Sequence, residues 1–217
     1  MPTRLKVCCI ASREEAALAI RHGASAIGLV SAMPSGPGPI DEALIAEIAA
    51  TVPPPIATFL LTSATTADAI AAQVRRCRPS TIQLVDAVDP AVYGELRLAL
   101  PGIRLVQVIH VRDESSIAEA RDAATQVDAL LLDSGNPTLA VKELGGTGRA
   151  HDWRLSRRIV EAVRVPVFLA GGLNAGNVRE AMATVRPFGI DACSGLRRGG
   201  RLDETKLAPF AATVLGA

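Results

Sequence analysis

The stretch VFLAGGLNAGNVREAMATVRPFGIDACSG, residues 167–195, contains one complete unit of the pattern that decides the fold. Two short apolar runs, Val167–Ala170 and Gly189–Cys193, flank a segment with helical periodicity, and turn residues separate the parts. Short apolar runs without strict alternation are typical of parallel strands covered on both faces. The stretch therefore predicts a strand–helix–strand unit with parallel strands.

Units of this kind repeat along the whole chain of 217 residues. The predicted strands are Lys6–Ile10, Ala26–Val30, Ala57–Thr62, Thr81–Val85, Arg104–Ile109, Ala129–Asp133, Val167–Ala170 and Gly189–Cys193. The predicted helix starts are Ser12 with Glu15, Asp41, Thr65, Asp89 with Pro90, Asp152, Asn174 and Asp203. Eight strand–helix units in a chain of this length predict an α/β fold, a (β/α)8 TIM barrel in which residues 1–217 form a single domain.

The composition excludes several classes of partner. Apolar residues make up 49% of the chain, and the net charge is +1 with acidic and basic residues interleaved. This balance gives no electrostatic case for binding a nucleic acid or a membrane. No signal-like segment opens the chain and no run of about 18 apolar residues occurs, so we expect a cytoplasmic protein. The four cysteines and three histidines show no metal-binding spacing, so we expect free thiols and no bound metal.

Two long connections follow predicted strands. Met33–Pro39 is rich in proline and glycine, and Ser134–His151 contains the run Gly145-Gly146-Thr147-Gly148. Loops of this length in a compact domain commonly act as lids or binding loops, although a solvated connection is the alternative. Both loops begin at the C-terminal ends of strands, where TIM barrels build their active sites.

Two residues near strand ends could carry acid–base chemistry. Cys8 would be a base if a nearby cation or helix N-terminus lowered its pKa, but a buried apolar role is the usual fate of a free cysteine. Its neighbour Cys9 is expected to face a helix instead. Asp133 follows an apolar run, where partial burial would raise its pKa and suit a general acid. Anchoring a loop is an equally good interpretation of Asp133.

Glycines after the last two predicted strands indicate a phosphate site. Backbone N–H groups in such turns, together with a helix N-terminus, can hold an anion. Phosphate sites built from the loops after strands seven and eight recur in TIM barrels. The predicted phosphate-binding residues are Gly171, Gly172, Asn174, Ser194 and Gly195. The arginines within residues 197–201 are better explained as solvated side chains.

Together these segments resemble the phosphoribosylanthranilate isomerase family of tryptophan biosynthesis. Motif order and spacing agree over nearly the whole chain, most strongly from Leu130 onward. The segments that carry the resemblance are Lys6–Ile10, Leu131–Asp133, Gly145–Arg149, Asp152-Trp153, Leu169–Asn174, Val185–Phe188 and Asp191–Gly195.

The resemblance implies a cofactor-free Amadori rearrangement of an N-(5-phosphoribosyl) amine, with N-(5'-phosphoribosyl)anthranilate as the first candidate. Asp133 would protonate the ribose ring oxygen, and the Cys8 thiolate would remove the C2′ proton. His110, Asp191 and Gly146 are further candidates for contact with the substrate. A small phosphorylated sugar would be the partner, and the protein would be a monomer or a homodimer.

The resemblance is weakest where the amine half of the substrate would bind. The family usually has an arginine for the anthranilate carboxylate after the second strand, whereas Pro34–Pro39 contains none. Cys9 replaces a usual glycine, Val85 replaces a usual histidine, and His110 stands where the family has none. Asp86 would disfavour an anionic amine if its carboxylate faced the mouth of the barrel.

Three alternatives therefore stay open. The chain could isomerise a different phosphoribosyl amine, or it could be a barrel that binds a phosphate ligand without catalysis. Retention of both Cys8 and Asp133 argues against the second, because a simple binder needs neither. A sugar-phosphate epimerase or lyase would place a lysine or metal ligands on barrel strands, and Lys6 is expected to lie too low for that role.

Overall fold

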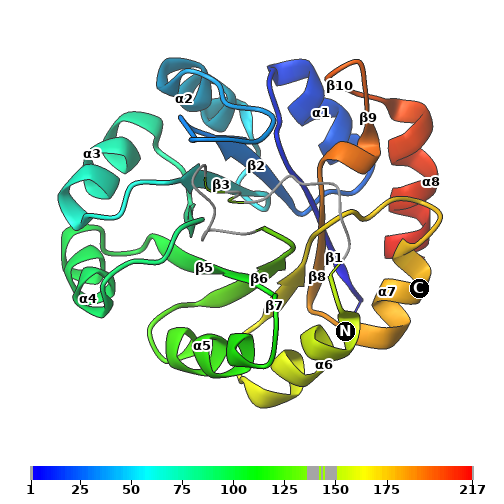
Figure 1. Ribbon diagram of the computed structural model, residues 1–217. Coiled ribbons are helices and arrows are strands. Elements are labelled where there is room, and N and C mark those ends of the chain that lie inside the picture. The colour runs from blue at the N-terminus through cyan, green and yellow to red at the C-terminus, as the bar shows by residue number, and fades with distance from the viewer. Residues whose placement is uncertain (1, 136–141, 143, 145–150, 217) are drawn as a thin grey trace.

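The structure is a computed structural model that describes residues 2–135, 142, 144 and 151–216. Within these residues, eight parallel strands pair in sequence order, and β1 pairs with β8 to close the barrel (Figure 1). The strands are β1 Arg4–Val7, β2 Ala26–Val30, β3 Ala57–Thr62, β4 Thr81–Leu84, β5 Arg104–His110, β6 Ala129–Asp133, β7 Val167–Leu169 and β8 Gly189–Ala192. The closed ring confirms the predicted TIM barrel.

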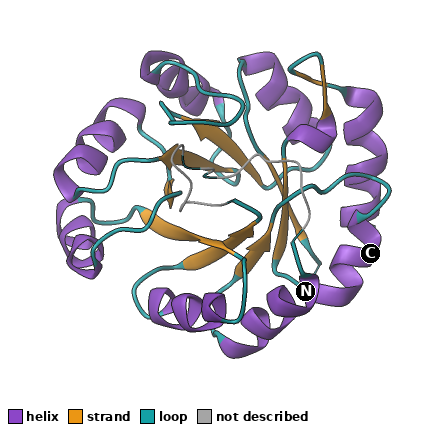
Figure 2. Cartoon of the chain, in the orientation of Figure 1, coloured by secondary structure: helices purple, strands orange, loops and turns teal. Residues whose placement is uncertain are grey.

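Helices form the outer layer around the ring of strands (Figure 2). They are α1 Arg13–Arg21, α2 Glu42–Thr51, α3 Ala67–Cys77, α4 Pro90–Ala99, α5 Ser115–Ala124, α6 Trp153–Ala162, α7 Val178–Val185 and α8 Glu204–Leu215. In α3 the residues Ile70, Val74 and Cys77 share one face and are buried, as the helical period requires. No helix among the described residues has the length and hydropathy needed to cross a membrane.

Alternation along the strands separates two apolar layers. Leu60 of β3 packs between the strands and the helices, whereas its neighbours Phe59 and Leu61 belong to the cluster inside the barrel. The interior positions at the first strand are Lys6 on β1 and Cys8 directly after it. A β-carbon built on Gly28 of β2 would lie 2.7 Å from the Cys8 sulfur and 3.2 Å from the Lys6 nitrogen, so this glycine leaves room for both side chains.

The first strand differs from its predicted range, Lys6–Ile10. Strand β1 begins at Arg4 and ends at Val7, and Cys9 has a φ of 61°. A residue in this left-handed region cannot continue a β-strand, so the prediction was wrong at the C-terminal end for a backbone reason. The other predicted strands agree with the structure to within one residue at each end.

The start of α7 also differs from the prediction. We expected Asn174 to open the helix, but α7 begins at Val178 with Asn177 as its N-cap. Asn174 instead forms a turn whose carbonyl accepts hydrogen bonds from the backbone N–H groups of Asn177 and Val178. Its side-chain oxygen accepts the N–H of Gly176 at 2.9 Å. The positive end of α7 therefore lies further along the chain than expected.

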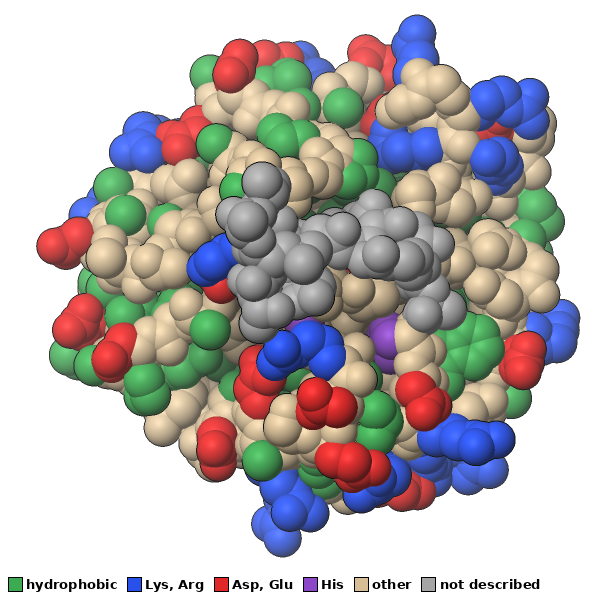
Figure 3. Space-filling model, in the orientation of Figure 1, with side chains coloured by type: hydrophobic (Ala, Val, Ile, Leu, Met, Phe, Trp, Pro, Cys, Tyr) green, Lys and Arg blue, Asp and Glu red, His purple; other side chains and the backbone are tan. Residues whose placement is uncertain are grey.

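After β8 the chain forms a short 3₁₀ helix, η1 Ser194–Leu196, and a small hairpin of β9 Arg197–Arg198 and β10 Arg201–Leu202. None of these three elements was predicted, because each is too short to show a period in the sequence. The space-filling view shows acidic and basic side chains interleaved on the visible face (Figure 3). This distribution agrees with the balanced charge of the sequence.

Candidate active site

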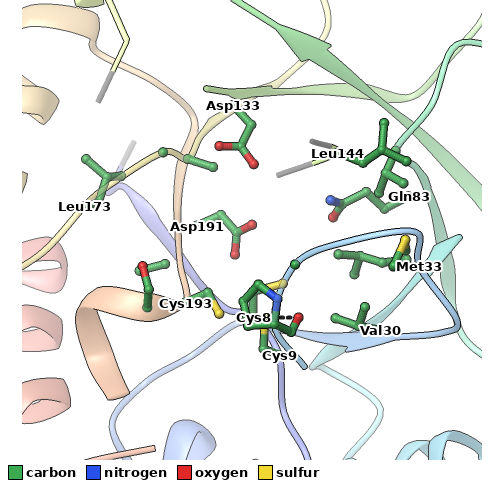
Figure 4. A pocket seen from close by; sticks show the side chains of 18 of the residues that line it. Cys8, Cys9, Val30, Met33, Gln83, Asp133, Leu144, Leu173, Asp191 and Cys193 are labelled. Carbon is green, nitrogen blue, oxygen red and sulfur yellow. Dashed lines mark hydrogen bonds between the residues drawn. The ribbon is translucent and has the colours of Figure 1, made fainter. Parts of the chain in front are cut away.

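A cavity, partly open to solvent, lies at the C-terminal ends of the strands. Among its lining residues are Cys8, Asp133, Asp191 and Cys193. In the close-up view Asp191 lies between Asp133 and the two cysteines that follow β1 (Figure 4). The structure thus brings together the predicted acid, the predicted base and one predicted substrate contact.

Asp191 has one satisfied and one free carboxylate oxygen. Its Oδ2 accepts a hydrogen bond from Lys6 Nζ at 2.8 Å, whereas its buried Oδ1 has no hydrogen-bond partner within the described part of the chain. Burial by itself lowers the pKa of Lys6, but the Asp191 carboxylate, together with Cys8 and Cys9, outweighs this effect and raises that pKa. Burial raises the pKa of Asp191, and Lys6 opposes this shift. An unpaired oxygen in a cavity is available to a donor on a ligand.

Asp133 is buried at the end of β6. Its Oδ1 accepts the backbone N–H of Ser134 at 2.7 Å. Burial raises the pKa of Asp133 above its ordinary value, and the nearby Asp191 carboxylate adds to this effect. The Ser134 N–H, His110 and Lys6 oppose it without cancelling it. A carboxyl group with a raised pKa is suited to hold a proton and to donate it.

Cys8 lines the cavity from the end of β1, and the backbone around it is fixed by a buried arginine. The guanidinium of Arg197 donates hydrogen bonds to the carbonyl oxygens of Cys8 and Cys9. It also pairs with Glu15, with 3.0 Å between Nη2 and Oε2. The Arg197 side chain is only 8% exposed, so this arginine is not the solvated residue that the sequence indicated. Sequence reasoning missed this network because its members are far apart in the chain.

Glu15 was expected to complete a capping box with Ser12. The Ser12 hydroxyl does accept the Glu15 N–H at 3.2 Å, as predicted. The Glu15 carboxylate, however, accepts the N–H groups of Ala11 and Leu202 in addition to pairing with Arg197. Glu15 therefore ties the end of β1 to the hairpin after β8.

The predicted phosphate-binding residues lie on two loops that touch. Gly171 and Gly172 both have positive φ and line the cavity with Ser194. A β-carbon on Gly195 would lie 2.1 Å from the carbonyl oxygen of Leu173, so only glycine allows the loops to approach this closely. The absence of a side chain at Gly195 therefore allows the two loops to lie in contact behind the lining residues.

Asn174 does not line the cavity. Its side-chain amide donates to the Gly172 carbonyl at 3.3 Å, and its N–H is bonded to the Asn177 side chain. Asn174 is thus placed to shape the Gly172 turn rather than to touch a ligand.

His110 lies beside Asp133 on the adjacent strand, because β5 and β6 pair at these two residues. It is buried, and its Nε2 lies 3.0 Å from the carbonyl oxygen of Val85. His110 is not among the residues that line the cavity, so a contact with substrate stays a prediction. Gly146 and most of the connection Ser134–His151 lie outside the described residues.

The other predicted loop borders the opposite side of the cavity. Met33, Ser35, Gly36 and Pro37 line it (Figure 4 labels Met33). Asp86, after β4, is 9% exposed at its side chain and pairs with Lys142. Its negative charge is therefore compensated by Lys142 and does not face the mouth of the barrel unpaired.

Comparison with known proteins identifies the family of the chain. The family model described as N-(5'phosphoribosyl)anthranilate (PRA) isomerase matches residues 5–213. The chain belongs to the PRA isomerase family. It is 35% identical over 205 residues to the N-(5'-phosphoribosyl)anthranilate isomerase of Methanocella arvoryzae, covering 94% of each chain. It is 38% identical over 209 residues to N-(5'-phosphoribosyl)anthranilate isomerase 2 of Methanosarcina mazei, covering 95% of this chain and 92% of that one.

Solved structures of PRA isomerases have the same fold. The crystal structure of phosphoribosyl anthranilate isomerase from Thermotoga maritima has a TM-score of 0.85 and 25% sequence identity, covering 99% of this chain and 100% of that chain. A PRA isomerase in complex with reduced 1-(o-carboxyphenylamino)-1-deoxyribulose 5-phosphate has a TM-score of 0.82 at 23% identity. The family resemblance of the sequence is therefore confirmed, and so is the fold.

The backbone explains one departure from the usual PRA isomerase sequence. Glycine is usual where Cys9 stands, and the φ of 61° at this position is one that glycine adopts without strain. Cys9 also lines the cavity instead of facing a helix, so that expectation was wrong. The left-handed turn reverses the alternation that placed Cys8 and Cys9 on opposite faces.

Proposed function

We propose that this chain catalyses the isomerisation of N-(5'-phosphoribosyl)anthranilate to a 1-deoxyribulose 5-phosphate product. Membership of the PRA isomerase family and full-length relatives named for this activity support the reaction. The observation that carries the proposal for this site is the convergence of Cys8, Asp133 and Asp191 on one cavity.

Asp133 serves as the general acid. The raised pKa of this buried carboxyl keeps its proton at a higher pH than an exposed aspartate does. Transfer of that proton to the ribose ring oxygen lets the bond between C1′ and this oxygen break. The nitrogen lone pair then forms the second bond of a C1′=N iminium.

Cys8 serves as the general base in the next step. Its thiolate removes the proton from C2′, and the C2′–H electrons form a C1′=C2′ bond while the iminium nitrogen regains its lone pair. The resulting enolamine tautomerises to the ketone. Asp191 lies between the acid and the base, where its free Oδ1 can accept a hydrogen bond from the substrate and stabilise the cationic iminium.

The phosphate rests on the backbone N–H groups of the loops that contain Gly171, Gly172 and Ser194, with Gly195 fixing the distance between the loops. Arg197 is occupied by Glu15 and by the β1 carbonyls, and Arg198 pairs with Asp203. Phosphate binding is thus assigned to backbone donors rather than to these arginines.

For the anthranilate carboxylate we propose Lys142. No arginine is among the described residues that line the cavity. Lys142 does not itself line the cavity, but its half-exposed ammonium group pairs with Asp86, and its carbonyl accepts a hydrogen bond from Ser35, which does line the cavity. Replacement of Lys142 by Met should raise KM for phosphoribosylanthranilate but leave KM for phosphoribosylaniline, which lacks the carboxylate, nearly unchanged. Equal effects on both substrates would contradict this assignment.

A turnover assay with phosphoribosylanthranilate tests the reaction. Wild-type protein, Cys8→Ser and Asp133→Asn are compared, with binding of the reduced product analogue measured in parallel. Each variant should lose about 10²–10⁴-fold in kcat but should still bind the analogue, because acid–base groups act on the transition state. If the wild type bound the analogue without turnover, the result would favour a binding protein. If it turned over only a different phosphoribosyl amine, that amine would replace phosphoribosylanthranilate as the proposed substrate.

The oligomeric state stays a prediction of monomer or homodimer. A solved relative from Thermotoga maritima is described as dimeric. Sedimentation of the purified chain would decide between the two states here.

A further inference from the structure

Three of the four cysteines converge on the cavity. Cys8 and Cys9 follow β1, and Cys193 follows β8. Strands β1 and β8 are paired neighbours in which Val7 stands opposite Ala192, so the residues that follow these two lie side by side. All three cysteines line the cavity, and Figure 4 shows them on the same side of it. The fourth, Cys77, is buried at the end of α3.

Cys9 and Cys193 lie close together at one side of the cavity. Cys193 follows Ala192, which stands opposite Val7, and the left-handed turn at Cys9 keeps this residue among those that line the cavity with Cys193. The two thiols interact, because each shifts the pKa of the other. The Cys9 sulfur also lies 3.6 Å from the carbonyl oxygen of Pro37. The interaction with Cys193, then the one with Cys8, then burial raise the pKa of Cys9.

The interaction with Cys9 lowers the pKa of Cys193, and Arg197 contributes to the decrease. One sulfur of the pair is therefore favoured as a thiolate, and the other holds a proton beside it. A thiolate next to a resolving thiol is the arrangement found in peroxide-sensitive cysteine pairs. Cys193 is also partly exposed, so a small oxidant can reach it through the cavity.

The proposed isomerisation uses neither sulfur of this pair. Metal binding is a weaker explanation of the cluster, because no group of three His, Cys, Asp or Glu side chains in the described part of the chain is arranged to hold a metal ion. The cluster is thus a chemical feature that the reaction does not require.

We propose that Cys9 and Cys193 form an oxidisable dithiol at the edge of the active site, which a hydroperoxide converts into a disulfide. The Cys193 thiol first loses its proton to solvent. The thiolate attacks one oxygen of hydrogen peroxide, the O–O bond breaks, and hydroxide leaves and takes a proton from solvent to become water. The product at Cys193 is a sulfenic acid. The Cys9 sulfur then attacks the sulfenic sulfur, its proton goes to the departing oxygen, and a second water leaves. In total, two thiols are oxidised and one peroxide is reduced to two waters.

Disulfide formation should reduce turnover. Cys193 directly precedes Ser194 of the phosphate loops, and Cys9 directly follows the base Cys8. A covalent bond between these positions would shift both backbones from their present hydrogen bonds. This consequence rests on the proposed isomerase function, whereas formation of the cross-link does not.

The test begins with mapping of the cross-link in the full chain. Protein treated with hydrogen peroxide is alkylated without reduction, digested with trypsin and analysed by mass spectrometry. Two of the four thiols should be lost, and the peptide of residues 7–13 should be linked to the one that contains Cys193. Because Cys8 and Cys9 share a tryptic peptide, single variants assign the partner.

The link should persist in Cys8→Ser and in Cys77→Ser, and should be absent from Cys9→Ser and Cys193→Ser. Oxidation of Cys193 should be at least about tenfold faster than that of Cys77, whose pKa is raised to about 11 by burial. Turnover of the oxidised wild type should fall at least about tenfold and return with dithiothreitol, whereas Cys77→Ser should behave like the wild type.

Two results would overturn the proposal. One is loss of the cross-link in Cys8→Ser with retention in Cys9→Ser, which would make Cys8 the partner. The other is a wild type that keeps four free thiols under peroxide conditions that fully oxidise glutathione. A cross-link in a chain without isomerase activity would leave the dithiol supported and would refute the proposed function instead.

Discussion

Lys6 and Asp191 form an ion pair inside the barrel, with 2.8 Å between the ammonium nitrogen and the carboxylate oxygen and side chains that are 0% and 7% exposed. The Lys6 nitrogen also lies 5.2 Å from the centre of the Phe59 ring. Lys6 therefore lies below Cys8, as expected, but it holds in place a carboxylate that faces the cavity. The pair joins the interior of the barrel to its active site.

Replacement of Lys6 by Met should destabilise the protein by about 3–5 kcal/mol, because it leaves the Asp191 carboxylate buried without its partner. The double variant Lys6→Met/Asp191→Asn should recover most of that loss, because no buried charge then remains. Urea unfolding at pH 7 measures both. A single variant as stable as the wild type would show that the pair is not buried in solution.

Asp133→Asn should lower activity but raise stability at neutral pH. Burial raises the pKa of Asp133, so the folded state carries an ionised group at a cost above that pKa. The gain should disappear below about pH 3.8, where the side chain is protonated in the folded and unfolded states alike. Urea midpoints recorded from pH 3 to pH 8 test this.

Asp128→Asn is the matched control, with the opposite expected sign. Burial acts to raise the pKa of Asp128, but the Leu105 N–H and Arg97 outweigh it and lower that pKa. The variant should lose about 1–3 kcal/mol at neutral pH, because hydrogen bonds to an ionised group are lost. If both variants were stabilised, the assignment of Asp133 as a costly buried charge would fail.

Gly195→Ala should raise KM at least about tenfold and weaken binding of inorganic phosphate. The added methyl carbon would meet the Leu173 carbonyl at 2.1 Å and force the two phosphate loops apart. Gly94→Ala, in α4 with nothing within 4 Å of the added carbon, should leave KM unchanged and stabilise the fold by about 0.5–1 kcal/mol. Unaltered phosphate affinity in Gly195→Ala would argue against the cradle.

His151 should make the fold acid-sensitive in a defined range of pH. Burial lowers the pKa of His151 to about 4, from an ordinary value of 6.5. Because the unfolded chain takes up the proton first, stability should be lost as the pH falls from about 6.5 to 4, by about 3 kcal/mol in total. His151→Gln should flatten the stability curve over this range, and a curve of unchanged slope would contradict the prediction.

The sequence predicts the barrel because apolar runs and helix caps are local signals. Asp89 and Asp152 cap α4 and α6 as expected, and β2, β3 and β6 have the predicted bounds. Caps and runs depend on a few adjacent residues, so a single sequence contains them. The family resemblance adds the order of the motifs, which is also visible along the chain.

What the sequence could not predict depends on contacts between distant residues. Lys6 and Asp191 are separated by 185 positions, and Arg197 reaches Glu15 across a similar distance. The early end of β1 depends on the backbone of Cys9, which Arg197 helps to hold. The sequence around Arg197 does not include Glu15, the acidic residue with which it pairs. From the sequence alone, Arg197 is therefore expected to lie in solvent.

The pairing of β1 with β8 determines when activity can appear during folding. The base Cys8 directly follows the first strand, whereas Asp191 lies on the last strand and one phosphate loop follows it. A barrel lacking its final strand and the loop after it would have the acid on β6 and the base after β1 but would lack the Asp191 carboxylate and that phosphate loop. Turnover therefore reports closure of the barrel. In a refolding chain, product should form only after β8 has paired with β1.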